Sequence, residues 1–476
     1  MGVLLVVDLD GSLIRSDMLA ECFFAALGRN PVGAIGALSR LGEGRAALKS
    51  RLAAIARPEV ERLPYNEAVL GRLEEARASG RRTALVSAAD QSLVEAVASH
   101  LGLFDEAHGS DGRRNLKGQA KAEFLVERYG REGFDYLGDA RADLDVWAEA
   151  RHAMTVGAGP GFSAEVTSRH PEAEHLDPTP GGLAALAPYL KAMRPHQWLK
   201  NTLVLLPALA AHSEDLAAWA MALLAAIAFS LTASSVYLLN DLLDISADRA
   251  HPRKRFRPFA AGRASLMNGA LLAVALLAAA FLLSLAFLPL QFLIVLAVYY
   301  VLTLAYSLGL KRMLVVDIAS LAGLYSLRVI AGAAATSIAL SPWMLAFCGF
   351  FFFALAAVKR QAELTDARAS GRAEIAGRAY RIEDWPVVMA MAVAAGHASV
   401  LVLALYIASP KVQGLYGAPD LLWGICPILL AWLCRLSIVT HRGEMTDDPL
   451  VFAIRDRVSW AVGAACLALG LLGTVL

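Results

Sequence analysis

The sequence predicts an N-terminal α/β domain with a parallel sheet and a helical cap, followed by an all-α membrane domain of about nine transmembrane helices. The chain of 476 residues is 57% hydrophobic and only 18% charged, which is too apolar for an ordinary soluble protein. Short apolar strands alternate with helical segments up to about residue 180, and much longer apolar segments follow Trp198. We therefore expect a soluble domain over 1–180, a linker and amphipathic lead-in over 181–198, and a membrane domain over 199–476.

The soluble domain contains short apolar runs that predict strands at 3–7, 82–86, 134–137 and 152–156. The first run is only a few residues long and follows no basic leader, so we expect a buried strand there and not a signal peptide. Residues 18–80 are mainly helix-patterned and too long for a simple crossover, which predicts a cap. The stretch 159–182 is rich in Pro, Gly and polar residues and is expected to be the linker.

The apolar segments of the second domain approach or reach the length needed to cross a bilayer. They lie near 199–212, 216–238, 266–287, 290–308, 313–335, 342–358, 386–408, 420–439 and 457–476. Counting the short first segment places all the basic loops on one side, namely 191–200, 249–263, 311–312, 359–381 and 435–442. The positive-inside rule then predicts a multi-pass inner-membrane protein with a cytoplasmic N-terminal domain and an external C-terminus.

The five cysteines have no metal-type or disulfide-type spacing, so we interpret all of them as packing residues. The bilayer is the predicted macromolecular partner. We predict no nucleic-acid partner, and a homo-oligomer is compatible with the sequence.

An acidic helix face is expected where the second membrane helix ends. At about 100° per residue its polar side chains fall within one quarter-turn, and they are Asn240, Asp241, Asp244 and Asp248. Clustered carboxylates at a membrane boundary repel one another and need compensating cations. Mg²⁺ fits this role because it binds carboxylates together with substrate phosphates, which predicts a diphosphate site.

Basic residues follow directly, from Arg253 to Arg257, and are suited to phosphate oxygens. A second polar cluster follows the sixth apolar segment, where Lys359, Glu363 and Asp366 share a helix face. Helix capping and the positive-inside rule would explain the basic residues alone, but they require no carboxylates.

The segment NDLLDISAD resembles the NDxxDxxxD signature of the UbiA-type prenyltransferase superfamily, and the resemblance covers residues 190–476. The segments RPHQWLKN, DRAHPRKRFRPFAAG, AYSLGLKR and KRQAEL are similar to the decaprenyl-phosphate phosphoribosyltransferase branch. That branch implies phosphoribosyl pyrophosphate as donor and a polyprenyl phosphate as acceptor. The second motif departs from the wider superfamily, because Glu363 and Asp366 replace a clear paired-aspartate signature.

The resemblance implies that Asn240, Asp241, Asp244 and Asp248 hold Mg²⁺ and diphosphate, with Glu363 and Asp366 assisting. A polyprenyl phosphate is already an anionic nucleophile, so positioning and charge neutralisation are the main requirements. The expected phosphate-binding side chains are Lys200, Arg255, Arg257, Lys311 and Lys359. Tyr306 and Asp317 are weaker candidates, and Asp317 could equally bond a neighbouring helix.

The soluble domain has polar residues at its predicted strand ends. Asp8 and Asp10 follow the first strand, Ser87 ends the second, and Asp139 and Asp143 follow the third. A lysine, either Lys117 or Lys121, lies between them in sequence. Two carboxylates two residues apart suit one nucleophile and one acid/base near a metal.

These residues resemble the four ordered motifs of haloacid-dehalogenase-type phosphatases over residues 3–160, which implies a Rossmann-like fold. By family roles Asp8 attacks phosphorus and Asp10 protonates the leaving group, while Ser87 and Lys121 hold the phosphoryl group. Asp139 and Asp143 complete a Mg²⁺ site with Asp8 and Asp10. We prefer Lys121 to Lys117 because its spacing before the following helix is closer to the family pattern.

The fusion suggests that the phosphatase removes the 5-phosphate from the lipid product of the transferase. Three other functions stay open: prenylation of an aromatic acceptor, a non-catalytic polyprenyl-phosphate carrier, and a phosphatase for an unrelated metabolite. The soluble domain could also be an inactive scaffold.

Overall fold

The computed structural model describes residues 3–38, 51–52, 54–110, 115–371, 375, 377–445 and 448–475. The chain forms two compact units. The first comprises Met1–Pro195 and Tyr237–Ala275, and the second comprises His196–Val236 and Leu276–Leu476. The first unit therefore includes the whole soluble domain together with the end of the second predicted membrane helix and the basic loop after it.

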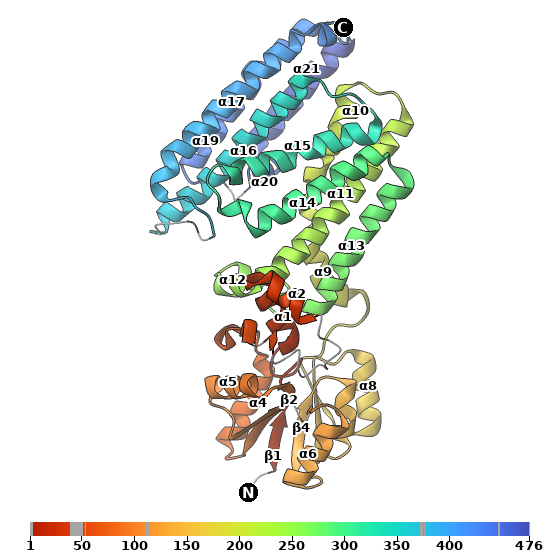
Figure 1. Ribbon diagram of the computed structural model, residues 1–476, viewed down its shortest axis with the longest axis vertical. Coiled ribbons are helices and arrows are strands. Elements are labelled where there is room, and N and C mark those ends of the chain that lie inside the picture. The colour runs from red at the N-terminus through yellow and green to blue at the C-terminus, as the bar shows by residue number, and fades with distance from the viewer. Residues whose placement is uncertain are drawn as a thin grey trace. The chain divides into compact units, whose positions relative to one another are not determined.

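The first unit contains a six-stranded parallel sheet in the order β3-β2-β1-β4-β5-β6. Three of its strands, β1, β2 and β4, are labelled in Figure 1. Its strands are β1 (Leu4–Val7), β2 (Thr83–Asp90), β3 (Glu106–Ser110), β4 (Phe134–Gly138), β5 (His152–Val156) and β6 (Glu174–Leu176). The four predicted strands are confirmed, and they are the four inner ones. The edge strands β3 and β6 were missed because their sequences, EAHGS and EHL, contain no apolar run.

Alternating side chains of the inner strands pack on opposite faces of this sheet. Leu5 and Val7 belong to a core with α4 (Glu67–Ala78) and α5 (Gln91–Leu101). Leu4 and Val6 belong to a second core, whose helical side chains come from α6 (Gln119–Tyr129), α7 (Leu144–Trp147) and α8 (Pro160–Arg169). Helices on both faces leave the carboxyl ends of the strands as the place for a site.

The predicted cap region begins with α1 (Met18–Arg29) and α2 (Pro31–Leu38) and continues to η2 (Val60–Arg62). Its residues 39–50 and 53 lie outside the described residues. The predicted linker was partly wrong, because 159–182 contains α8 and β6. Pro160 starts α8, and Val166 is buried, so this stretch folds against the sheet despite its composition.

Eight helices in the described part of the chain are long and apolar enough to cross a membrane. They are α11 (Leu216–Leu243), α13 (Leu266–Phe287), α14 (Leu290–Leu308), α15 (Val316–Thr336), α16 (Pro342–Ala369), α17 (Trp385–Ile407), α19 (Ile425–His441) and α21 (Arg457–Val475). The 3₁₀ turns directly before α17 and α19 extend those two spans to Ile382–Ile407 and Pro419–His441. Shorter helices precede or connect them: η4 (Gly182–Leu186), α9 (Ala187–Met193), η5 (Pro195–Leu205), α10 (Leu206–Ala210), α12 (Ile245–Ala250), η6 (Lys254–Phe256), η7 (Leu310–Arg312), η8 (Ile382–Asp384), α18 (Pro410–Gln413), η9 (Pro419–Gly424) and α20 (Pro449–Arg455).

The ninth predicted segment, 199–212, is not one long helix but runs through η5 and α10. Two hydrogen bonds join the regions at the ends of this segment to α11. The indole N–H of Trp198 donates to Ser234 of α11, and the indole N–H of Trp219 of α11 donates to the carbonyl of Ser213. A 3₁₀-helix rises about 2.0 Å per residue against about 1.5 Å in an α-helix, so η5 gains about 5 Å over an α-helix of equal length. The short segment is thus hydrogen-bonded to α11 between Trp219 and Ser234.

Close packing of η5 on α15 depends on Gly332. A Cβ at this position would lie 1.9 Å from the carbonyl oxygen of Val204. Gly332→Ala is expected to lower the free energy of unfolding by at least about 2 kcal/mol, because backbone must move to relieve the overlap. A lower melting temperature in detergent would show this loss.

The matched control for Gly332→Ala is Gly349→Ala in α16, where a Cβ meets nothing within 4 Å. That substitution should keep or raise the melting temperature, because alanine favours a helix over glycine. Equal melting temperatures for the two variants would contradict the close approach of η5 to α15.

Candidate active sites

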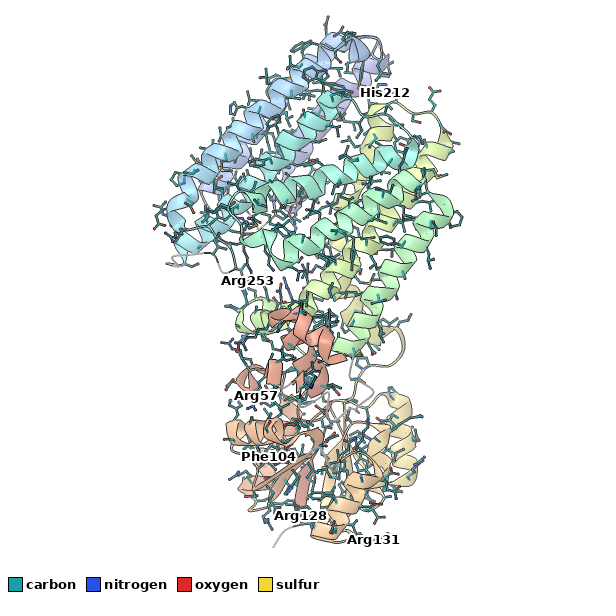
Figure 2. The ribbon with its side chains drawn as sticks, viewed as in Figure 1. Arg57, Phe104, Arg128, Arg131, His212 and Arg253 are labelled. Atoms are coloured by element: carbon teal, nitrogen blue, oxygen red, sulfur yellow. The ribbon has the colours of Figure 1, made fainter. Side chains whose placement is uncertain are left out.

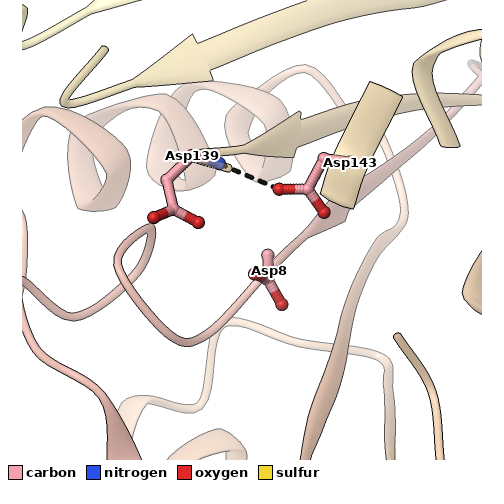
Figure 3. A group of neighbouring side chains, drawn as sticks. All are labelled: Asp8, Asp139 and Asp143. Atoms are coloured by element: carbon pink, nitrogen blue, oxygen red, sulfur yellow. Dashed lines mark hydrogen bonds between the residues drawn. The ribbon is translucent and has the colours of Figure 1, made fainter. Parts of the chain in front are cut away.

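Three carboxylates converge at the carboxyl ends of β1 and β4. Asp8 directly follows β1, Asp139 directly follows β4, and Asp143 lies in η3 (Arg141–Asp143). Their nearest ligand atoms all lie within 4.8 Å of one another (Figure 3). The strands β1 and β4 are hydrogen-bonded neighbours in the sheet. The residues that directly follow them, Asp8 and Asp139, therefore lie at the same edge.

Two glycines leave room for these carboxylates. A Cβ on Gly11, whose φ is +74°, would lie 2.1 Å from Oδ2 of Asp139. A Cβ on Gly138 would lie 2.6 Å from Oδ2 of Asp143. Glycine at these two positions therefore leaves the space that the carboxylates of Asp139 and Asp143 occupy.

Lys121, from α6, reaches into this cluster. Its Nζ donates to Oδ1 of Asp8 at 2.8 Å and lies 3.7 Å from Oδ1 of Asp143. Lys117 is exposed and has no such contact among the described interactions. The structure thus places Lys121, the preferred lysine of the sequence analysis, at the strand-end cluster.

The other two expected residues lie at the same edge of the sheet. Ser87, fully buried in β2, accepts a hydrogen bond from the backbone N–H of Ala89 at 3.0 Å. Asp10 is half-buried and accepts from the backbone N–H of Met18, the first residue of α1, at 2.8 Å. Asp10 is therefore held by the start of the cap.

Burial and mutual repulsion perturb the protonation of the carboxylates. Burial raises the pKa of Asp8 to about 6, with Lys121 opposing and Asp143 reinforcing that shift. Burial, and then the charges of Asp8 and Asp143, raise the pKa of Asp139 well above its usual value. Burial alone would lower the pKa of Lys121, but Asp8 and Asp143 outweigh it and raise the pKa. The cluster is short of positive charge.

A divalent cation fits this shortage. Three carboxylates face one lysine, which leaves two negative charges when all are ionised. The ligand atoms are all carboxylate oxygens, the type that Mg²⁺ prefers. Asp8, Asp139 and Asp143 are the residues that could hold it, and in the described part of the chain no other set of three His, Cys, Asp or Glu side chains is so close.

Tyr136 is a residue of this site that the sequence analysis missed. Its hydroxyl accepts from Lys121 at 2.8 Å and donates to Oδ1 of Asp143 at 2.8 Å. The other oxygen of Asp143 accepts from the backbone N–H groups of Asp139 and Ala140. The available signal was position: Tyr136 lies two residues before Gly138 on an inner strand, on the face that α6 covers.

Tyr136→Phe is expected to weaken Mg²⁺ binding by about 10-fold, because groups that orient metal-binding carboxylates have effects of that order. Calorimetric titration of the full chain with Mg²⁺ measures this change. Tyr129→Phe is the control, since the Tyr129 hydroxyl bonds Glu106 at the edge strand instead. Unchanged affinity in Tyr136→Phe would show that the hydroxyl does not orient Asp143.

The first unit contains a second polar cluster where α11 ends and α12 begins. Asp241 and Asp248 are both almost fully buried, and Nη1 of Arg257 lies between them at 3.1 and 2.7 Å. Nη2 of Arg194 donates to the same oxygen of Asp241 at 2.5 Å. Arg194 and Arg257 thus lie against two of the carboxylates that are expected from sequence to bind Mg²⁺.

Arg194 was not among the expected site residues. It ends α9 with a left-handed backbone, φ +54°, and its guanidinium lies 5.2 Å from the ring centre of Tyr237. The sequence contained a signal, since Arg194 begins the quoted segment RPHQWLKN. Burial raises the pKa of Asp248, against the influence of Arg257.

The remaining expected residues of this cluster are less enclosed. Asn240 and Asp244 are half-buried, and Asp244 lies at the junction of α11 and α12. Arg255 is exposed and stacks on Phe256, and Arg253 is exposed on the same loop (Figure 2). Arg194 pairs with Asp241, and Arg257 pairs with both Asp241 and Asp248.

The second unit brings two expected lysines to an aspartate that the sequence analysis missed. Lys200 forms an ion pair with Asp448, and Nζ of Lys359 lies 3.8 Å from the same oxygen. Nζ of Lys200 also lies 5.7 Å from the ring centre of Tyr325. Asp448 precedes α20 and is far from both lysines in sequence, so only the fold could reveal it.

The second acidic motif has a different arrangement from the one expected. Glu363 pairs with Arg360, which is fully buried and lies 2.7 Å from Oδ2 of Asp317. Asp317 also accepts from Tyr306 at 2.9 Å and from Arg378 at 3.1 Å. Asp317 therefore bonds neighbouring elements, the alternative given for it from sequence.

Asp366 and Lys311 complete the expected set in this unit. Asp366 is exposed in the last turns of α16, and Lys311 is half-buried in η7, where its carbonyl accepts from Arg378. Neither Glu363 nor Asp366 forms part of a three-residue ligand set among the described side chains.

A cavity of about 630 Å³ in the second unit extends from Lys200. Its lining is mostly apolar and comes from η5, α16, α19, α20 and α21, including Leu429, Trp432, Trp460 and Leu467. His196 and Lys200 provide polar groups at its wall. A cavity of this size with few polar groups is typical of a small-molecule or lipid-chain site.

Comparison with known proteins agrees with both halves of the chain. Residues 202–454 match the UbiA prenyltransferase family, and residues 5–147 match haloacid dehalogenase-like hydrolases. The uncharacterised protein y4nM of Sinorhizobium fredii is 40% identical over 463 residues, covering 97% of this chain and 89% of that protein.

Two further relatives cover 60% of this chain. Nodulation protein NoeC of Azorhizobium caulinodans is 37% identical over 286 residues, which is 92% of its length. Decaprenyl-phosphate phosphoribosyltransferase of Mycobacterium tuberculosis is 34% identical over 294 residues, which is 93% of its length. The family resemblance inferred from the sequence motifs is confirmed, and the chain is a multi-pass membrane enzyme with a transferase and a phosphatase domain. This chain belongs to the UbiA prenyltransferase family and has a haloacid dehalogenase-like hydrolase domain ahead of the family's membrane domain.

Proposed function

We propose that the chain transfers 5-phosphoribose from phosphoribosyl pyrophosphate to a polyprenyl phosphate with release of diphosphate, and that its N-terminal domain then removes the 5-phosphate of the lipid product. The similarity to a decaprenyl-phosphate phosphoribosyltransferase supports the first step. The buried cluster of Asp8, Asp139, Asp143 and Lys121 supports the second. We place both reactions at the cytoplasmic face of the inner membrane, on the side of the basic loops.

The acidic cluster of α11 and α12 is the proposed donor site. The observation that carries the transferase assignment is that buried carboxylates and arginines meet there. Asp241, Asp244 and Asp248 gather where α11 ends and α12 begins, and Arg194 and Arg257 lie against two of them, so the cluster offers both metal ligands and phosphate-binding groups. Mg²⁺, held by these carboxylates and Asn240 through oxygen ligands, would neutralise the departing diphosphate. Arg194 and Arg257 can turn their guanidinium groups from carboxylates to phosphate oxygens.

The cavity beside Lys200 is the proposed acceptor site. A polyprenyl phosphate has a long apolar chain and an anionic head, and the cavity offers an apolar lining with Lys200 in its wall. The acceptor phosphate would take the place of Asp448 as a partner of Lys200 and Lys359. Since the phosphate is already ionised at neutral pH, no general base is needed for its attack on the ribose.

The phosphatase step uses the strand-end cluster of the first unit. The Asp8 carboxylate attacks phosphorus, the bond from phosphorus to the ribose 5-oxygen breaks, and the Asp10 carboxyl gives its proton to that oxygen. Water then attacks the aspartyl phosphate, Asp10 takes its proton, and inorganic phosphate leaves Asp8 free. Mg²⁺ held by Asp8, Asp139 and Asp143 would offset the charge of the phosphoryl group. Tethering raises the effective concentration of this site over the lipid product.

The direct test supplies the purified full-length chain in detergent with ribose-labelled phosphoribosyl pyrophosphate and decaprenyl phosphate. We expect label to move into the lipid phase, with diphosphate released in equal amount and only when the polyprenyl phosphate is present. Label that stays in water, together with transfer from a prenyl diphosphate to an aromatic acid, would replace this function with aromatic prenylation. Binding of decaprenyl phosphate without any transfer would indicate a carrier.

A further inference from the structure

Within the first unit, a buried ion pair connects α1, the first helix of the cap region, to α12. Nη1 and Nη2 of Arg249 donate to the two carboxylate oxygens of Glu21 at 2.8 and 2.7 Å. The Arg249 and Glu21 side chains are 7% and 1% exposed. Nε of Arg249 donates to the carbonyl of Ala260 at 3.0 Å, so the guanidinium uses all three nitrogens.

Two close backbone approaches surround this pair. A Cβ on Gly28, in α1, would lie 2.8 Å from the carbonyl oxygen of Leu243. A Cβ on Gly262, in the basic loop, would lie 2.6 Å from Cβ of Arg15 and 3.0 Å from Cβ of Pro64. The cap and the segment around α12 are therefore packed together at three separate points.

The pair lies one helix turn from the contact that holds Asp10. The backbone N–H of Met18 donates to Oδ1 of Asp10, and Met18 and Glu21 both belong to the first turns of α1. Glu21 N–H donates to the carbonyl of Asp17, the residue that caps α1. A shift of α1 at Glu21 would thus move the N–H group that orients the Asp10 carboxyl.

A buried ion pair is poor evidence for stability, because desolvation of the two charges offsets most of their attraction. A bidentate arginine–carboxylate pair fixes distance and angle, however. Arg249 lies in α12, in the motif region of the membrane domain. We propose that it is a positioning residue for the phosphatase and that it acts on Asp10 through Glu21 and α1. This inference rests on the proposed phosphatase function.

The chemistry of the leaving group gives a readout that a purely structural role would not change. Proton donation by Asp10 matters for an alkyl phosphate, whose alkoxide is a poor leaving group. It matters little for an aryl phosphate such as p-nitrophenyl phosphate, whose phenolate leaves without a proton. The value of kcat/KM reports the first irreversible step, formation of the aspartyl phosphate, for both esters. The ratio of the two values is also independent of the fraction of folded enzyme.

The experiment compares ribose 5-phosphate with p-nitrophenyl phosphate in the full-length chain and in Arg249→Gln. We expect kcat/KM for ribose 5-phosphate to fall at least about 10-fold more than that for p-nitrophenyl phosphate, within the range of general-acid effects. Arg263→Gln removes an exposed charge from the same loop and should leave the ratio unchanged. Glu21→Gln, alone and with Arg249→Gln, should give the same change in ratio, because both substitutions break one contact.

Equal reductions for the two esters, or no reduction, would overturn the positioning role. If Arg249→Gln does not fold, Arg249→Lys keeps the charge but loses the two-pronged contact, and it should shift the ratio in the same direction. A wild-type chain that hydrolyses neither ester would instead overturn the phosphatase function on which the inference rests.

Discussion

Replacing Asp241 and Asp244 together with asparagine is expected to reduce phosphoribosyl transfer at least about 1,000-fold, as removal of groups that stabilise transition-state charge does in other enzymes. Asparagine keeps the size of each side chain but removes two of the three carboxylates of the acidic cluster. Arg194 and Arg257 would then lose Asp241 as a charged partner. Any residual transfer should require a higher Mg²⁺ concentration, because only Asp248 and Asn240 of the proposed ligands are left unchanged.

Transfer is measured as label moving from phosphoribosyl pyrophosphate to the lipid phase across a series of Mg²⁺ concentrations. Asp420→Asn is the control, since Asp420 is exposed in η9 and belongs to neither polar cluster. Its activity should equal that of the wild type. The melting temperature of the double variant must stay close to the wild-type value for the loss to be chemical.

The second large effect is expected from Asp8→Asn. An amide cannot attack phosphorus, so release of inorganic phosphate from ribose 5-phosphate should fall at least about 10,000-fold, as when other enzymes lose a nucleophile. The acidic cluster of α11 and α12 is untouched, so phosphoribosyl transfer should continue. The two activities of one chain would then separate in a single variant.

Asp145→Asn is the matched control for Asp8→Asn, because Asp145 is exposed in α7 only two residues from Asp143. It should keep full phosphatase activity. Phosphate release by Asp8→Asn at the wild-type rate would show that the strand-end cluster is not the hydrolytic site.

Most of the fold could be predicted because its signals are local and strong. The four inner strands are apolar runs, and all eight long membrane helices lie close to the predicted segments. The exceptions are elements that tertiary contacts stabilise. The edge strands β3 and β6 have no apolar run, and η5 spans its distance by a longer rise per residue that hydropathy does not report.

The strand-end cluster was predictable for the same reason, since parallel strands bring the residues after them to one edge. The polar clusters around Asp241 and Asp448 were less predictable from sequence. Asp448 meets Lys200 across 248 positions of sequence, and Arg194 reaches Asp241 through a left-handed turn. The sequence indicates that the charges of Asp241 and Asp248 need compensation, but which side chains contact them depends on the fold.

The most direct test of two consecutive reactions is the mass of the lipid products. Wild-type and Asp8→Asn chains are incubated with phosphoribosyl pyrophosphate, decaprenyl phosphate and Mg²⁺, and the extracted lipids are compared by mass spectrometry. We expect decaprenylphosphoryl ribose from the wild type and its 5-phosphate ester, heavier by one phosphoryl group, from Asp8→Asn. The same lipid from both chains would contradict dephosphorylation of the transferase product by the N-terminal domain.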